Sequence, residues 1–371
     1  MAPAPGIAMC QSVDSIKDHE QEEPSAMQVT TVGLDLAKNV FQVHGIDDAG
    51  TVIVRRSLRR RQVMPFFSNL APCLVGMEAC GTSHFWAREL RTMGHEVKLM
   101  PPIYVKPYVK RGKTDAADAA AICEAVGRPT MRFVPIKSAE QQSVLALHRT
   151  RDLLIGQRTQ LVNMIRAQLA EFGIVLAKGI EHALRLVDQL VEGVVPDIPS
   201  LACTVLIALA EPVGALQIRI ARLEDEIKAR FQDDEAARRL ATIPGVGTIT
   251  ASALAASVTD PKRFASARQF AASLGLTPRA DCSGGRERMG RISKMGDRYL
   301  RRLLINGMTS QLQAARRKPE VYPWVAGLLA NGKPNKLVAV AMANKAARIA
   351  WVVMARGEIY RPNRPVAEGT A

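Results

Sequence analysis

The chain has 371 residues, of which 47% are hydrophobic and 5% aromatic, and its formal net charge is +15. This length allows two or three domains with a substantial core, and the composition favours a helix-rich globular protein over a disordered one. The six cysteines show no paired CxxC spacing, no signal segment is recognisable, and the longest mainly apolar run, residues 201–210, is too short to span a bilayer. We therefore expect a protein of the reducing cytoplasm with no membrane role.

Residues 1–27 differ from the rest of the chain. They hold five acids and one base, which leaves a net charge of +19 for the remainder. Because the segment has no sustained apolar period, we predict a flexible acidic extension, and residues 358–371 are predicted to be a flexible tail. The strong positive charge of the remainder is typical of proteins that bind a polyanion such as nucleic acid.

The first structured region opens with strands. Residues 28–46 predict two strands joined by a tight link at residues 37–39, and Asp35 lies in the first of them. A turn at residues 47–50 precedes a third strand at residues 51–55, so we predict an antiparallel meander. An unpaired carboxylate on an apolar strand is costly, which makes Asp35 a candidate functional residue rather than a surface charge.

The next elements predict a strand-helix-strand unit. Residues 73–78 form a short apolar strand that ends in Glu78, and a helix over residues 83–93 and a strand over residues 95–100 follow. His44, His84 and His95 lie in these strands and this helix, where a histidine is more often packed or at the surface than catalytic.

A basic segment at residues 106–113 precedes a helix predicted over residues 115–126, with Thr114 as its N-cap. Asp115 and Asp118 are three residues apart, so they share one face of this helix and can converge on one ligand. Carboxylates beside a basic segment would repel phosphates unless cations neutralise them, and bound Mg²⁺ resolves this conflict.

Asp35, Glu78, Asp115 and Asp118 together have the order expected of an RNase H-like nuclease core, with two acids on strands and two on the following helix. Four such carboxylates can hold two magnesium ions about 3.5–4 Å apart, which would activate a nucleophile and stabilise the leaving oxygen of a phosphodiester.

Residues 138–232 have the pattern of long helices with two apolar stripes, interrupted by Gly and Pro at residues 193–199. The pattern fits either an internal helical bundle or a dimerising coiled coil. The stripes consist of Leu147, Leu154, Leu161, Ile165, Leu169 and Phe172, and of Leu216, Ile220, Leu223, Ile227 and Phe231.

The last region, residues 236–357, is predicted to be mainly helical. It opens with Ile-Pro-Gly-Val-Gly at residues 243–247, a run that is typical of a helix-hairpin-helix. In such a motif Gly245 and Gly247 let backbone N–H groups approach a phosphate. The same run can also be a simple capping turn. Ser283, followed by two glycines, is a candidate nucleophile, with Ser293 as the alternative. Candidate nucleic-acid contacts are Lys106, Lys110, Arg111, Lys113, Arg286, Arg288, Arg291, Lys294 and Arg298.

Five short runs in a fixed order resemble the IS110 (insertion sequence one-ten) family of DEDD transposases, over about residues 28–357. They are Val32-Gly33-Leu34-Asp35-Leu36-Ala37-Lys38, Gly76-Met77-Glu78-Ala79-Cys80-Gly81, Lys113-Thr114-Asp115-Ala116-Ala117-Asp118, Ile243-Pro244-Gly245-Val246-Gly247 and Ser283-Gly284.

The resemblance implies a RuvC-like (RNase H-like) catalytic domain over residues 28–130, a helical coiled-coil region over residues 138–232 and a transposase domain over residues 236–357. It implies that the acidic tetrad binds Mg²⁺ as two ions and that Ser283 forms a covalent phosphoserine bond to DNA. It also implies donor and target DNA, a guide (bridge) RNA encoded by the element, and a nucleoid-associated homo-oligomer, dimer or tetramer, whose active site is completed between protomers.

Two other functions fit the same residues. A RuvC-like junction nuclease would use the tetrad and Mg²⁺ to hydrolyse DNA with water, without a covalent intermediate. A nucleic-acid-binding protein with a degenerate nuclease core is the non-enzymatic reading, and the intact tetrad argues against it.

Overall fold

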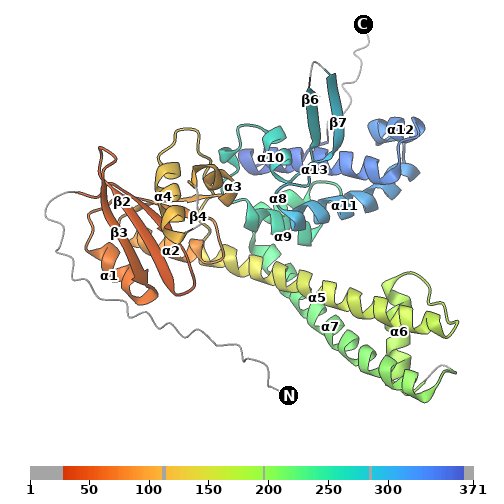
Figure 1. Ribbon diagram of the computed structural model, residues 1–371. Helices are drawn as coiled ribbons and strands as arrows, with labels where there is room; N and C mark the ends of the chain where they lie inside the picture. The colour runs from red at the N-terminus through yellow and green to blue at the C-terminus, as the bar shows by residue number, and fades with distance from the viewer. Residues whose placement is uncertain (1–27, 111–113, 195–196, 284–285, 363–371) are drawn as a thin grey trace, which may run out of the picture. The chain divides into compact units, whose positions relative to one another are not determined.

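The computed structural model describes residues 28–110, 114–194, 197–283 and 286–362 (Figure 1). The chain forms two compact units, of which the first ends at Ile136 and the second begins at Lys137. The predicted acidic extension at residues 1–27 lies outside the described residues, as does the greater part of the predicted tail.

The first unit is built on a five-stranded mixed sheet with the strand order β3-β2-β1-β4-β5. β1 pairs antiparallel with β2 and parallel with β4, while β3 and β5 form the two edges. The third strand runs to Arg59, four residues further than predicted, because β2 pairs with it as far as Val40 opposite Arg59. The strands are β1 (Thr31–Asp35), β2 (Val40–Ile46), β3 (Val52–Arg59), β4 (Leu74–Glu78) and β5 (Glu96–Met100).

Helices cover both faces of this sheet. Val32, Leu34 and Phe41 point to one face, where they pack in a core with Trp86 and Leu90 of α2. Alternate residues of the same strands point to the other face, which α4 covers. The helices are α1 (Val63–Ser68), α2 (Ser83–Thr92), α3 (Pro102–Val105) and α4 (Asp115–Val126). Thr114 caps α4 by accepting a hydrogen bond from the Ala117 amide at 3.2 Å, which confirms the predicted start of this helix.

Two glycines side by side allow α4 to approach the sheet closely. Gly33 of β1 and Gly76 of β4 are register partners. A Cβ atom at Gly33 would lie 2.1 Å from the carbonyl oxygen of Ala119, and one at Gly76 would lie 2.7 Å from Cβ of Val126. Only glycine therefore fits where the backbone of α4 passes over these strands.

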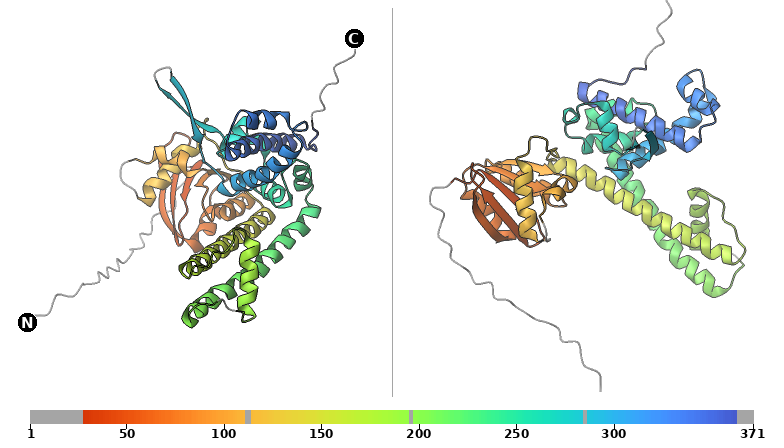
Figure 2. Two further views of the ribbon diagram at one scale, coloured as in Figure 1. Left: turned by 90° about the vertical axis from the view of Figure 1, so that its right-hand side faces the viewer. Right: turned by 45° about the horizontal axis from the view of Figure 1, so that its top comes forward.

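The second unit begins with an arm of three helices. α5 (Ala139–Glu171) and α7 (Ser200–Asp233) lie side by side, and α6 (Ile180–Val191) packs near their distal end (Figures 1 and 2). A core that includes Ile165, Val187 and Leu206 joins all three helices. Ile165 and Leu169 of the first predicted stripe lie in this core, and Leu216, Ile220 and Ile227 of the second stripe are buried, whereas Phe172 is exposed. The short helix α6, which begins after Gly179, was not predicted.

Two described helices, α7 and α13 (Asn335–Arg356), are long and apolar enough to cross a membrane by length and composition alone. This is weak evidence for a membrane role, because core helices pass the same test. α13 places Ala343, Ala347 and Ala350 in the core of the second unit, and α7 contributes Leu206 and Ala210 to the core of the arm.

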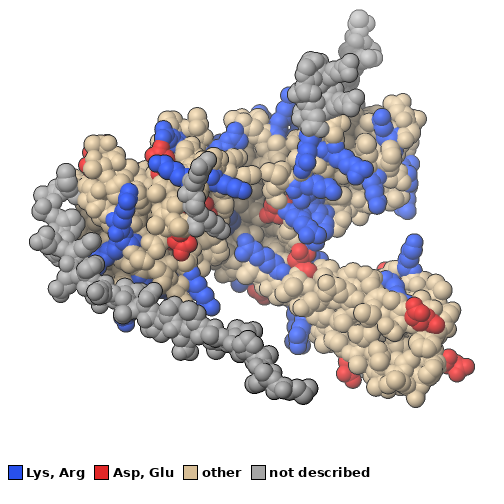
Figure 3. Space-filling view, viewed as in Figure 1, with Lys and Arg blue, Asp and Glu red and all other residues tan. Residues whose placement is uncertain are grey.

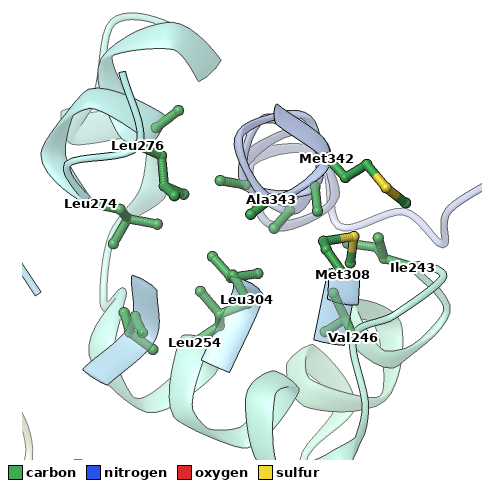
Figure 4. Close-up of a cluster of buried hydrophobic side chains, with 14 of the residues drawn as sticks. Ile243, Val246, Leu254, Leu274, Leu276, Leu304, Met308, Met342 and Ala343 are labelled. Atoms are coloured by element: carbon green, nitrogen blue, oxygen red, sulfur yellow. The ribbon is translucent and has the colours of Figure 1, made fainter. Parts of the chain in front are cut away.

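The remainder of the second unit is mainly helical around one large core (Figure 4). It contains α8 (Glu235–Ala241), α9 (Thr248–Ser257), α10 (Ala267–Ser273), α11 (Arg298–Arg317), α12 (Pro323–Ala330) and α13 (Asn335–Arg356). A two-stranded antiparallel hairpin, β6 (Pro278–Ser283) and β7 (Arg286–Ile292), interrupts the helices. The mixed sheet and these helices confirm the predicted combination of an α/β N-terminal region and a helical C-terminal region, and the hairpin adds an element that was not predicted.

A buried histidine connects the arm to this helical core. The ring of His148 on α5 lies with Nδ1 3.1 Å from the Tyr299 hydroxyl and Nε2 3.1 Å from the Ser252 hydroxyl. Only 1% of His148 is exposed. Burial, reinforced by the nearby Arg151, lowers the pKa of His148 to about 4. The ring is therefore neutral at physiological pH and bridges two hydroxyl groups.

We expect this histidine to make folding sensitive to acid. The unfolded chain binds a proton at His148 with a pKa near 6.5, whereas the folded chain resists protonation down to about pH 4. The free energy of unfolding should thus fall as the pH is lowered from about 6.5 to 4, by about 2 kcal/mol at pH 5. Thermal unfolding at pH 7.5 and pH 5 should show a smaller difference for His148→Gln than for the wild type. An equal difference would contradict this account.

Candidate metal centre

Three of the four predicted carboxylates meet at one point of the first unit. Asp35, Asp115 and Asp118 each place one carboxylate oxygen within 4.8 Å of the others. Asp35 is the last residue of β1, and the other two lie in the first turn of α4. A cluster of carboxylate oxygens is the donor set that hard divalent cations such as Mg²⁺ prefer, so these residues fit such an ion.

The pattern of β1 and β4 explains why the acids converge. Both strands end with Val-Gly, one apolar residue and an acid, as Val32-Gly33-Leu34-Asp35 and Val75-Gly76-Met77-Glu78. Side chains two residues apart on a strand point to the same face, so each acid lies on the face where its glycine admits α4. The close approach of α4 brings its first turn over the end of β1.

Glu78 lies outside the triplet but interacts with it electrostatically. Its pKa is raised by burial and by the charges of Asp35 and Asp118. Burial likewise raises the pKa of Asp35, and the charges of Asp118 and Asp115 add to this effect. Each of these two carboxylates resists ionisation because the others are near, and a bound cation would remove that repulsion.

Comparisons with known proteins identify the family of the chain. A model for the DEDD transposase of IS110 matches residues 32–174, and a model described as the transposase IS116/IS110/IS902 family matches residues 237–322. A probable family 20 transposase from Pseudomonas aeruginosa is 48% identical over 91% of this chain and 100% of its own length. The chain belongs to the IS110 family of transposases.

Further relatives of this IS110-family transposase cover nearly the whole chain. A transposase for insertion sequence element IS1328 from Yersinia enterocolitica is 42% identical over 90% of this chain and 98% of its own length. A transposase for element IS1111A from Coxiella burnetii is 38% identical over 96% and 97%, respectively. The protein is therefore an enzyme that acts on DNA, as the resemblance of its five short runs implied.

The structure places the remaining predicted residues of the transposase in different settings. Lys106 and Lys110 are exposed beside α4, while Arg111 and Lys113 lie outside the described residues. Gly247 is exposed as the N-cap of α9. Gly245 has a positive φ of 81° and faces α11, where an added Cβ atom would lie 2.4 Å from the Met308 side chain. Gly245 thus packs closely against α11, and the contact of both glycines with a phosphate stays a prediction.

The candidate nucleophile lies at the end of the hairpin. Ser283 is the last residue of β6 and pairs with Arg286 of β7, and the glycines that follow it are outside the described residues, as are the side chains of Ser283, Arg286 and Arg288. Arg291, Lys294 and Arg298 are exposed. Ser293 lies at the base of the hairpin, where its amide donates to the Thr277 carbonyl oxygen at 2.8 Å.

One basic cluster of the transposase was not predicted. Five arginines, Arg55, Arg56, Arg59, Arg60 and Arg61, occur within seven residues along β3 and just after it, and all are exposed. None of the five forms an ion pair with a described carboxylate, whereas Arg302 of α11 pairs with Asp152. Figure 3 shows that basic side chains predominate over acidic ones on the face in view. The density of arginines alone could have identified this cluster.

Proposed function

We propose that this IS110-family transposase cuts and rejoins DNA with magnesium-bound carboxylates and a serine nucleophile. The observation that carries the proposal is the convergence of Asp35, Asp115 and Asp118 at one point. The mixed sheet, with three antiparallel strands followed by two parallel ones, supports an RNase H-like (RuvC-like) domain. The exposed Gly247 at the start of α9 supports a helix-hairpin-helix contact to a phosphate.

The three aspartates and Glu78 would hold two magnesium ions. When bound, the ions would supply Lewis-acid stabilisation of the phosphate oxygens. The Ser283 hydroxyl loses its proton and attacks phosphorus, which forms a Ser–O–P ester and breaks the bond from phosphorus to a sugar oxygen. The released sugar oxygen takes up a proton. A sugar hydroxyl of a second DNA strand then attacks the phosphoserine, so the strands are rejoined and the serine is regenerated.

The carboxylates and Ser283 lie in different units, so we propose that substrate binding or association of protomers brings them together. A homo-oligomer is part of this proposal. A guide RNA encoded by the element is the third component, and it is supported by the family resemblance and by the large positive charge of the chain. Exposed basic residues on both units offer contacts to the phosphates of donor DNA, target DNA and RNA.

The test is to trap the covalent intermediate. Protein purified from cells that carry the whole element would be incubated with labelled donor DNA and Mg²⁺, denatured, and examined for protein that retains the label. We expect a Ser283-linked adduct in the wild type and none in Ser283→Ala, while DNA binding is retained because one hydroxyl contributes little to a phosphate-dominated interface. Chelation of Mg²⁺ and removal of RNA by nuclease should each abolish the adduct.

A different result would contradict each component of the proposal. Loss of the adduct in Ser293→Ala but not in Ser283→Ala would move the nucleophile to Ser293. Recombination at full rate by RNA-free protein would exclude RNA guidance. Normal cleavage without an adduct in any variant would favour the alternative function, a RuvC-like nuclease that hydrolyses DNA with water.

A further inference from the structure

A groove of about 350 Å³ lies beside the carboxylates in the first unit. It is bounded by β2, β3 and the first turns of α4, and we call it the β3 groove. Small side chains on α4, those of Ala116, Ala117 and Ala120, form one wall and leave the space open. The opposite wall is mainly polar and comprises Gln42, Val43, His44, Arg55, Arg56 and Ser57.

The register of the sheet makes the groove continuous with the carboxylates. Asp35 of β1 pairs with Gln42 of β2, and Gln42 pairs with Ser57 of β3. The three side chains form a row across adjacent strands on the face that α4 covers. Because neighbouring strands are about 4.8 Å apart, Ser57 lies only about 10 Å from Asp35 along this row. On α4, Ala116 and Ala117 lie between Asp115 and Asp118.

The polar wall suits the sugar-phosphate backbone of a nucleic acid. The Gln42 amide donates a hydrogen bond to the Ser57 hydroxyl at 2.9 Å, which fixes both groups toward the groove. Arg55 is exposed beside the buried His44, its register partner on β2. Among the described residues no carboxylate forms an ion pair with Arg55, so its charge is available to a phosphate.

We propose that the β3 groove binds the DNA strand that is cut, a short distance from the phosphate held at the carboxylates. The inference rests on the proposed function, because it takes the carboxylate triplet to be the site of cutting. DNA is favoured over RNA because the row from Asp35 to Ser57 continues directly from that triplet. Arg55 would contact a phosphate, and Gln42 and Ser57 would contact the adjoining sugar and phosphate oxygens.

A photo-cross-linking experiment tests this assignment. A benzophenone amino acid would replace Ser57 in the full-length protein, and the matched control would carry it at Arg91, an exposed residue of α2, which covers the opposite face of the sheet. The probes are a labelled DNA that spans the element end and a labelled transcript of the element's non-coding segment. With EDTA present to prevent cutting, we expect the Ser57 position to cross-link to DNA close to the cut site, and the Arg91 position to give no such product.

A second variant measures the contribution of Arg55 without an inserted group. Arg55→Gln should weaken binding of the DNA probe and reduce the slope of log affinity against log salt by about 1, as expected for one lost phosphate contact. Arg91→Gln removes the same charge from the opposite face and should leave the slope unchanged. Circular dichroism would establish that both variants are folded.

The possible results distinguish failure of the groove assignment from failure of the proposed function. Cross-links to the transcript alone would make the groove an RNA site and overturn the assignment, as would the absence of any cross-link or an unchanged salt slope in Arg55→Gln. If DNA cross-links at the Ser57 position but replacement of the carboxylates leaves cutting intact, the groove stands and the proposed function fails. If replacement of the carboxylates abolishes cutting but no DNA cross-link forms at the Ser57 position, the proposed function stands and the groove assignment fails.

Discussion

Replacing Asp118 with asparagine should lower the rate of DNA cutting by about three orders of magnitude, because a metal site contributes several kcal/mol to the transition state and each 1.4 kcal/mol is about tenfold. The amide preserves the volume of the side chain but removes its charge from the triplet. The measurement is the rate of strand cutting at saturating Mg²⁺. Undiminished cutting would remove Asp118 from the site.

The same substitution should not destabilise the metal-free protein. The pKa values of Asp35 and Glu78 are raised partly by the charge of Asp118, so the folded state holds protons on these groups more tightly than the unfolded state does. Unperturbed carboxyl groups ionise at about pH 4, so the ionisation of Asp35 and Glu78 lowers the stability of the fold as the pH rises above that value. Asp118→Asn removes one of the repelling charges and therefore reduces this loss of stability at neutral pH. The melting temperature in EDTA should equal or exceed that of the wild type.

In the presence of Mg²⁺ the wild type should instead be more stable than Asp118→Asn. A ligand that binds only the folded state stabilises it by about 2.7 kcal/mol at a hundredfold excess over its dissociation constant. The wild type should gain this stabilisation, and Asp118→Asn should gain much less. The matched control is Glu124→Gln on the same helix, an exposed residue paired with Arg128 one turn further on. That variant should respond to Mg²⁺ and cut DNA like the wild type.

Replacing Gly33 with alanine should destabilise the first unit by about 3 kcal/mol or more, at the upper end of the range for overpacked sites. The added Cβ atom would meet the Ala119 oxygen at 2.1 Å and the Cys123 nitrogen at 2.5 Å. Both are backbone atoms of α4, so no side-chain rotation relieves the overlap and the helix must move from the sheet. Because α4 carries two aspartates of the triplet, we expect weaker Mg²⁺ binding in any Gly33→Ala protein that folds.

Gly127→Ala is the control for this prediction. Gly127 follows α4, has a φ of −80°, and would place a Cβ atom in open space. Alanine there should be neutral or slightly stabilising. Urea unfolding of both variants would compare the two sites, and equal stability would show that α4 is not held close to β1 as described.

The elements of the first unit were largely predictable because their signals are local. The strand that ends in Asp35 follows from its apolar residues, and the start of α4 follows from Thr114, whose side chain caps the helix as predicted. The proximity of Asp115 and Asp118 follows from helical spacing alone. That Asp35 joins them depends on Gly33 and Gly76, whose importance is evident only once α4 is seen to pass above them.

Other features depend on long-range contacts that a single sequence does not reveal. The hairpin β6–β7 was hidden because its residues are polar and lack an alternating apolar pattern. The close packing of Gly245 could not be predicted, because its neighbours Gly307 and Met308 are more than sixty residues away in sequence. His148 shows no special pattern within α5, and its partners Ser252 and Tyr299 come from two other helices.

The exposed arginines of β3 also oppose aggregation of the folded protein. β3 is an edge strand, so its outer N–H and C=O groups could pair with a strand of another molecule and begin aggregation. Bulky like charges on such an edge repel a second copy of the same edge. Neutralising all five arginines at once would therefore risk insoluble protein for a reason unrelated to nucleic acid. Single substitutions such as Arg55→Gln keep the edge charged.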